Sequence, residues 1–147
     1  MPNTLFRLTD DTEYAVVEMG MDHAGEIERL TRCARPSAGI ITMIGVSHLE
    51  NLGTRENILK AKLEICTGLP DGAPLALNAD NDLLPTASIP SRLRPVWFGI
   101  DAANADVRAV DVVTGANGTT SKSSIRSTVR SMPPSRQRAS TRSTTRW

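Results

Sequence analysis

The sequence has few of the residues that mark secreted or membrane proteins. Its only two cysteines, Cys33 and Cys66, form no CxxC pair, so we expect a reducing compartment. Both fall on apolar positions of expected helices, where small buried hydrophobic residues are the usual reading. The longest apolar run, residues 38–46, is far too short to cross a bilayer, and no basic segment followed by an apolar one opens the chain. We therefore expect a cytoplasmic protein without membrane insertion.

Acidic residues are absent from the last part of the chain. Residues 1–116 hold 16 acidic and 10 basic residues, whereas residues 117–147 hold seven Lys or Arg and no acid. In this last part 14 residues between 119 and 147 are Ser or Thr, so too little apolar surface exists to offset the entropy of ordering. We predict a folded domain at residues 1–120 and a disordered tail at residues 121–147. Because the tail has one aromatic residue and no folded basic face, we expect no nucleic-acid partner.

Apolar runs alternate with helical patterns through the acidic part. The second expected helix has Thr54 as a plausible N-cap and Gly68 as a plausible stop. Strands that alternate with helices through short connections predict an α/β fold with a mostly parallel sheet. The expected strands are residues 14–19, covered on both faces, and residues 38–44, 74–77 and 96–100; the expected helices are residues 25–34 and 55–67, and residues 107–113 fit an antiparallel edge strand.

Two of the expected strands end in residues that could bind a ligand. Glu18 ends the first strand in AVVEMG, and His48 follows the second in GVSHLENLG. Ligands of open α/β sheets bind at the carboxyl ends of strands, where a carboxylate can hold Mg²⁺ through its preferred oxygen ligands. On position alone, a solvent-facing or structural role explains each residue better. Glu50 either orients His48 or faces water.

Two lysines of the expected helix 55–67 lie on different faces. Lys60 belongs to an ordinary solvated charge stripe with Glu56 and Glu64, each four positions away. Lys62 is rotated about 200° from it, at 100° per residue, in line with Ile58 and Cys66. Lys62 is therefore either a snorkelling lysine at the rim of the apolar face or a functional amine whose pKa is lowered by partial burial.

Taken together, the segments VVEMG, GVSHLENLG, KAKLEI and NADN resemble the central, ATP-binding domain of the Mur ligases, the amide-bond-forming enzymes of peptidoglycan synthesis. The resemblance covers about residues 2–120. Within the family, it is strongest to the ligases that add D-alanyl-D-alanine to UDP-N-acetylmuramoyl-tripeptide. It implies ATP and Mg²⁺ as cofactors, UDP-N-acetylmuramoyl-peptide and D-alanyl-D-alanine as partners, an acyl phosphate intermediate, and a monomer.

The resemblance also implies roles for individual residues. Glu18 and His48 match the family's magnesium ligands, and Lys62 matches a lysine that several Mur ligases carry in carbamylated form, where it supports a second magnesium. Asp22 and His23 stand where the family usually has Asn-His and are candidates for contact with the UDP-sugar-peptide. Asp22 keeps an acceptor there but loses a donor. In NADN, residues 78–81, we expect a turn and cap rather than a ligand.

Several parts of the family's active site have no counterpart in the sequence. The glycine-rich phosphate-binding loop would precede Met1, and a Gly-His-Asn segment and the C-terminal domain would follow Thr120. The GANGTT segment, residues 115–120, lacks the lysine of a phosphate loop. The resemblance implies that this segment forms a strand turn. We therefore expect a ligase fragment that is inactive alone, because the backbone nest and lysine for the phosphates are missing. The alternative is a non-catalytic binding or regulatory module that retains the UDP-sugar-peptide crevice.

The acidic residues and the family's motifs disappear together after residue 120. A shifted reading frame produces such a joint change at one position. We therefore hypothesise that residues 121–147 are an out-of-frame translation. Translating the same nucleotides in the two other frames tests this, because one of them should restore alternating strand residues and a Gly-x-His-Asn-like segment.

Overall fold

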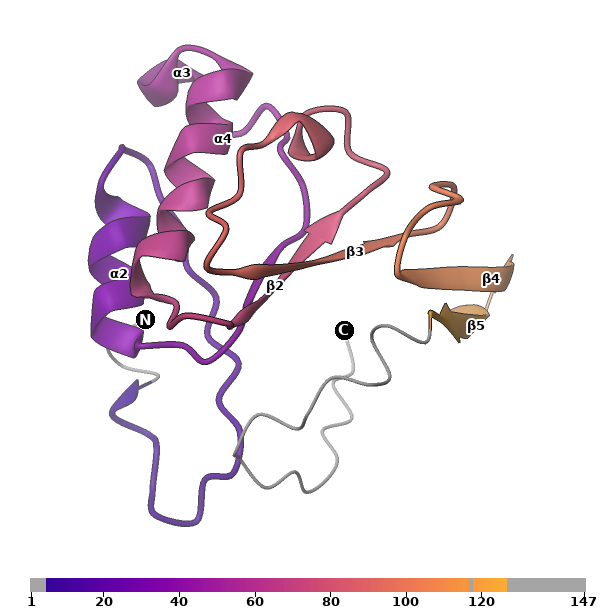
Figure 1. Cartoon of the computed structure of the whole chain (residues 1–147), viewed down its shortest axis with the longest axis horizontal. Helices are drawn as coiled ribbons and strands as arrows, with labels where there is room; N and C mark the ends of the chain where they lie inside the picture. The colour runs from indigo at the N-terminus through magenta and orange to yellow at the C-terminus, as the bar shows by residue number, and fades with distance from the viewer. Residues whose placement is uncertain (1–4, 117, 127–147) are drawn as a thin grey trace.

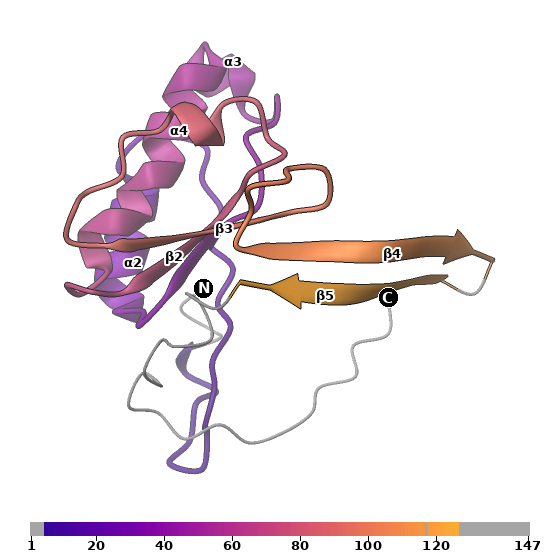
Figure 2. The same ribbon diagram turned by 45° about the vertical axis from the view of Figure 1, so that its right-hand side comes forward.

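The computed structural model describes residues 5–116 and 118–126, which form a five-stranded sheet with helices packed on one face (Figures 1 and 2). The strands lie side by side in chain order: β1 (Gly39–Ile41), β2 (Pro74–Asn78), β3 (Arg94–Gly99), β4 (Val107–Gly115) and β5 (Gly118–Ile125). β1 to β4 are parallel, and β5 pairs antiparallel with β4. This confirms the predicted α/β class and its mostly parallel sheet. The expected antiparallel edge strand at residues 107–113 is β4, but β4 lies inside the sheet and is parallel to β3, and the antiparallel edge strand is β5.

The helices follow the predicted positions closely. They are α2 (Glu26–Ala34), α3 (Leu49–Leu52) and α4 (Arg55–Leu63), with two 3₁₀ turns, η1 (Glu64–Gly68) and η2 (Leu84–Thr86). The expected helix 55–67 is thus α4 continued by η1. Thr54 caps α4 as predicted, because its side-chain oxygen accepts a hydrogen bond from the Asn57 N–H at 3.2 Å. Within the part of the chain that the structure describes, no helix is both long and apolar enough to cross a membrane.

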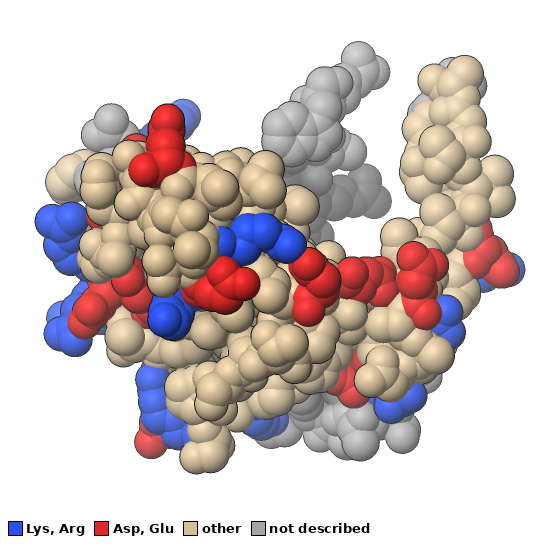
Figure 3. Space-filling model, turned by 90° about the horizontal axis from the view of Figure 1, so that it is seen from above, with Lys and Arg blue, Asp and Glu red and all other residues tan. Residues whose placement is uncertain are grey.

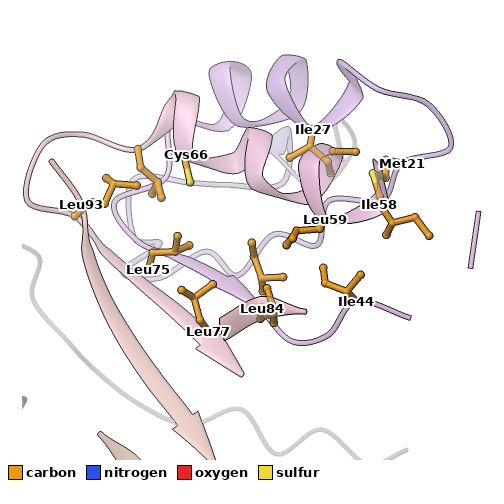
Figure 4. Packing of buried hydrophobic residues seen from close by; sticks show 14 residues of the cluster. Met21, Ile27, Ile44, Ile58, Leu59, Cys66, Leu75, Leu77, Leu84 and Leu93 are labelled. Atoms are coloured by element: carbon orange, nitrogen blue, oxygen red, sulfur yellow. The ribbon is translucent and has the colours of Figure 1, made fainter. Parts of the chain in front are cut away.

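The hydrophobic core lies between the helices and one face of the sheet (Figure 4). Leu75 and Leu77 of β2 are fully buried, and they pack in one cluster with Ile58 of α4 and Leu84 of η2. Burial of each such side chain contributes about 1.5–3 kcal/mol, so this cluster fastens α4 to the sheet. On the opposite face of the sheet, Ile40 is 58% exposed.

The two cysteines differ in their surroundings. Cys66 is buried, as predicted, whereas the prediction of a buried Cys33 is wrong because this residue is exposed. In α2 the buried residues are Ile27 and Thr31, four positions apart on one face. Cys33 lies two positions beyond Thr31, about 200° around the helix and therefore away from that face.

The predicted buried strand at residues 14–19 is wrong. These residues form no helix or strand, and the side chain of Val16 is 95% exposed. In the described sheet β1 is the terminal strand and pairs with β2. An apolar run becomes a buried strand only where another strand can bond its backbone N–H and C=O groups, and residues 14–19 have no such neighbour in the described sheet.

The predicted start of a disordered tail at residue 121 is also wrong. β5 extends to Ile125, which lies opposite Val107 of β4. The ladder to β4 satisfies the backbone of this polar segment, and threonine suits a strand. The GANGTT segment spans the end of β4, the turn and the start of β5, as expected. The remainder of the predicted tail, residues 127–147, lies outside the described residues, and the hypothesis of a shifted reading frame stays a prediction.

Candidate functional site

The segment that leaves β1 is held by side chains from α4 and β2. It carries the chain through residues 42–47 to His48, at the carboxyl end of the strand. Three successive carbonyl oxygens accept hydrogen bonds: Asn78 Nδ2 donates to Thr42 O at 2.9 Å, Lys62 Nζ to Met43 O at 2.8 Å and Arg55 Nη2 to Ile44 O at 2.8 Å. The Ile44 side chain is 1% exposed and belongs to the core. The exit from β1 is therefore fixed by both polar and apolar contacts.

Arg55 extends this network to the loop after β2. Its Nη1 and Nη2 donate to the two carboxylate oxygens of Asp82 at 2.7 and 2.6 Å, which lowers the pKa of Asp82. Such a bidentate pair defines direction as well as distance. Viewed from above, this end of the molecule has Lys or Arg side chains directly beside Asp or Glu side chains (Figure 3). The sequence reasoning missed this pair, because nothing in the spacing of Arg55 and Asp82 indicates contact.

The NADN segment forms the turn that the sequence predicts. Asn78 Oδ1 accepts from the Asp80 N–H at 2.9 Å, as in an Asx turn. The Asp80 carboxylate accepts hydrogen bonds from the N–H groups of Ile100, Asp101 and Ala102, and these bonds lower the pKa of Asp80. Asp80 therefore ties the end of β2 to the loop after β3.

Lys62 lies on the side of α4 that faces the end of β1. Its bond to Met43 O points it there, while Lys60 is exposed, so the predicted difference between the two lysines is confirmed. Partial burial lowers the pKa of Lys62. A lowered pKa raises the fraction of neutral amine, the form that reacts with carbon dioxide.

His48 and Asp22 are brought together from two loops. His48 Nδ1 lies 2.7 Å from Asp22 Oδ1, and the His48 backbone has a left-handed φ of 66°. The backbone at Asp22 is held by Glu26, because the N–H groups of Asp22 and His23 donate to Glu26 Oε2 at 2.6 and 3.0 Å. These bonds lower the pKa of Glu26. Glu50 is exposed on α3, so the carboxylate against His48 is that of Asp22.

The other predicted site residues are less organised. Glu18 is exposed in the segment without helix or strand, and His23 is exposed just before α2. No group of three or more His, Cys, Asp or Glu side chains within the described residues could hold a metal ion. Mg²⁺ commonly uses only one or two protein carboxylates beside waters and substrate phosphates, so the oxygen donor of Glu18 suits it in kind.

A hollow of about 400 Å³ lies beside the hairpin of β4 and β5. Its lining includes Asn78 and Asp80 from the end of β2, Arg108 from β4 and Lys122 from β5. The sequence reasoning missed it, because β5 was expected to be disordered from residue 121 onward.

Comparison with known sequences places these observations in one family. Residues 1–134 match the Mur ligase middle domain. The UDP-N-acetylmuramoyl-tripeptide–D-alanyl-D-alanine ligase of Escherichia coli is 40% identical over 121 residues, which is 81% of this chain and 26% of that protein. The ligase of the same name from Bacillus subtilis is 47% identical over 87 residues, 59% of this chain and 19% of that protein. The chain thus spans about a quarter or less of the length of these relatives.

Comparison with solved structures gives the same fold. MurF from Acinetobacter baumannii superposes with a TM-score of 0.68 at 24% identity, over 83% of this chain and 29% of that chain. MurF from Thermotoga maritima, solved in complex with ADP, superposes with a TM-score of 0.61 at 26% identity, over 72% of this chain and 24% of that chain.

Proposed function

This chain belongs to the Mur ligase family through its middle domain. On that premise we propose that it is part of an ATP-dependent ligase that joins D-alanyl-D-alanine to UDP-N-acetylmuramoyl-tripeptide in the cytoplasm. The observation that carries the proposal is the match of residues 1–134 to the middle domain. The 40% identity to the Escherichia coli ligase supports the choice of substrates.

The proposed reaction has two steps. The terminal carboxylate of the UDP-sugar-peptide attacks the γ-phosphorus of ATP, which forms an acyl phosphate and releases ADP. The amine of D-alanyl-D-alanine then attacks the acyl carbon, a proton leaves the nitrogen, and phosphate departs as the amide bond forms. Magnesium, when bound, neutralises charge on the transferring phosphoryl group. In this proposal Glu18 supplies an oxygen ligand and His48 a nitrogen ligand, while Asp22 and His23 face the UDP-sugar-peptide.

We assign Lys62 a separate role as a carbamate. Its neutral Nζ attacks carbon dioxide, a nitrogen–carbon bond forms, and the nitrogen loses a proton, which leaves a carboxylate at the end of the side chain. The lowered pKa of Lys62 and its direction toward the end of β1 support this role. The new carboxylate would hold a second magnesium and help to place the substrate carboxylate.

A chimera tests the proposal. The matching 121-residue segment of the Escherichia coli ligase is replaced by the corresponding residues of this chain, and phosphate release that depends on D-alanyl-D-alanine is measured. We expect activity in the chimera and a loss of at least about 10- to 100-fold in Glu18→Ala and His48→Ala, because losing even an outer-shell partner of a metal ligand typically costs that much. A folded chimera that binds the UDP-sugar-peptide without turnover would instead favour the non-catalytic binding module.

The two lysines of α4 provide a matched pair in the same chimera. Lys62→Ala should lose most of the activity and Lys60→Ala little, because only Lys62 points to the end of β1. Short carboxylic acids added to the Lys62→Ala chimera should restore part of the activity by replacing the carbamate. Equal losses in both variants would contradict the assignment of Lys62.

A further inference from the structure

Asp22 is positioned against His48 although the two residues lie on different loops. One loop precedes α2 and the other follows β1, and the contact joins Asp22 Oδ1 to His48 Nδ1 at 2.7 Å. Neither side chain is buried, since His48 is 39% and Asp22 65% exposed. An exposed ion pair alone contributes little to stability. The contact is therefore better understood through what it does to the imidazole ring.

The loop that carries Asp22 is anchored on both sides of this residue. Met21, directly before it, is 6% exposed and belongs to the core. On the other side, Glu26 Oε2 accepts from the N–H groups of Asp22 and His23. The loop ends at Gly25, whose N–H donates to Glu64 Oε1 of η1 at 2.7 Å. Asp22 is thus presented by a loop whose backbone has little freedom.

The loop that carries His48 is anchored in the same manner. Ile44 is in the core, and its carbonyl accepts from Arg55. His48 itself adopts φ 66°, a left-handed conformation that is uncommon for residues other than glycine. Such conformations persist where the surroundings determine them and concentrate at functional positions. Two independently anchored loops therefore meet at one carboxylate–imidazole contact.

We propose that Asp22 is a positioning residue that holds the ring of His48 with Nδ1 protonated and Nε2 bare and directed away from Asp22. A histidine ring has two distinct nitrogens, and the partner of one sets the state of the other. A carboxylate at Nδ1 fixes the ring's rotation and makes Nε2 a better electron-pair donor. The use of Nε2 in the ligase reaction rests on the proposed function, but the pairing itself does not.

The test is nitrogen NMR of the full chain in its His23→Gln background, which leaves His48 as the only histidine. Long-range proton–nitrogen correlation at about pH 9, where imidazoles are neutral, reports which ring nitrogen carries the proton. We expect Nδ1–H in this background. In Asp22→Ala the chemical shifts of the two ring nitrogens should move toward those of the Nε2–H tautomer. Asp22→Asn should keep the Nδ1–H pattern, because its amide oxygen still accepts a hydrogen bond. Asp71→Ala, at an exposed carboxylate beside Arg92, is the matched control and should change nothing.

Two results would overturn the proposal. The first is an Nε2–H ring in the parent protein, a result that needs no Asp22 variant and so does not depend on that variant folding. The second is an unchanged ring in Asp22→Ala while the methyl signals of Leu75 and Leu77 show an intact core.

A metal probe separates this proposal from the proposed function. Mn²⁺ added as a paramagnetic substitute for Mg²⁺ should broaden the His48 ring protons, and at least three-fold less in Asp22→Ala. Absence of broadening in all variants, with the predicted tautomer in place, would support the positioning role of Asp22 and count against the metal role of His48.

Discussion

The two residues expected to bind magnesium lie in regions built in different ways. His48 follows a paired strand, and the segment before it is bonded through three carbonyl oxygens to α4 and β2. Glu18 lies in residues 14–19, which form no helix or strand and expose Val16 almost completely. Both residues belong to motifs of equal clarity in the sequence. In this chain, a strand-end motif therefore becomes an organised site where the strand is paired and the segment that leaves it is held by hydrogen bonds.

The largest expected effect is the difference in stability loss between a substitution in the core near the His48 segment and one in residues 14–19. Leu77→Ala removes a fully buried side chain of the core cluster that also holds Ile44, in the segment leading to His48, and should lower the free energy of unfolding by about 2–5 kcal/mol. Val16→Ala should change it by less than about 0.5 kcal/mol, because Val16 is 95% exposed. Urea denaturation measures both. A loss above about 2 kcal/mol in Val16→Ala would show that residues 14–19 pack in solution and would remove the contrast.

A smaller effect is expected from the start of α4, the helix that carries Arg55 and Lys62. Thr54→Ala removes the oxygen that accepts from the Asn57 N–H and should destabilise the protein by about 1 kcal/mol. Thr54→Ser keeps the oxygen and is the matched control, with a change of a few tenths at most. Denaturation midpoints compare the two variants. Equal losses in the two variants would mean that the cap does not stabilise α4, and hence does not stabilise the helix whose Arg55 and Lys62 hold the segment before His48.

The smallest expected effect is the pH dependence of stability that Asp80 contributes. Three backbone N–H groups lower the pKa of Asp80 below its ordinary value of 3.8, so its carboxylate stabilises the folded state fully above that value. This stability is lost as the pH falls through the lower, folded pKa. Asp80→Asn should therefore be less stable than the parent at neutral pH and converge with it at strongly acidic pH. Denaturation across this range checks the sign, and a constant difference at every pH would contradict it.

The elements predicted correctly are those whose signals are local. The spacing of apolar residues and the cap at Thr54 predicted α4, and the pattern of residues 74–77 predicted β2. The strand at residues 14–19 could not be predicted reliably, because an apolar run carries no information on whether a neighbouring strand is present to bond it. Cys33 was misplaced for a related reason, since α2 is short and only Ile27 and Thr31 define its buried face.

The candidate site was predictable residue by residue but not contact by contact. The direction of Lys62 follows from its helical angle relative to Lys60, which the sequence contains. The contact between Asp22 and His48 depends on how two loops are anchored. Glu64 shows the same limit: spacing suggested a partner of Lys60, whereas its carboxylate accepts from the Gly25 N–H. Long-range polar contacts of this kind arise from the packed fold and leave no periodic signal.

The outer end of the β4–β5 hairpin is a suitable place to attach a reporter group to this protein. Beyond Val110 both strands are exposed, and Asp111 adopts φ 54° at a break in the pairing register. The outer end of the hairpin thus lies away from the core and from α3, the helix that His48 precedes (Figure 2). A fluorophore or affinity tag inserted between Gly115 and Gly118 would disturb few buried contacts, since exposed turns accept insertions best. A fluorophore at this position could report ligand binding at the other end of the sheet without contacting the residues there.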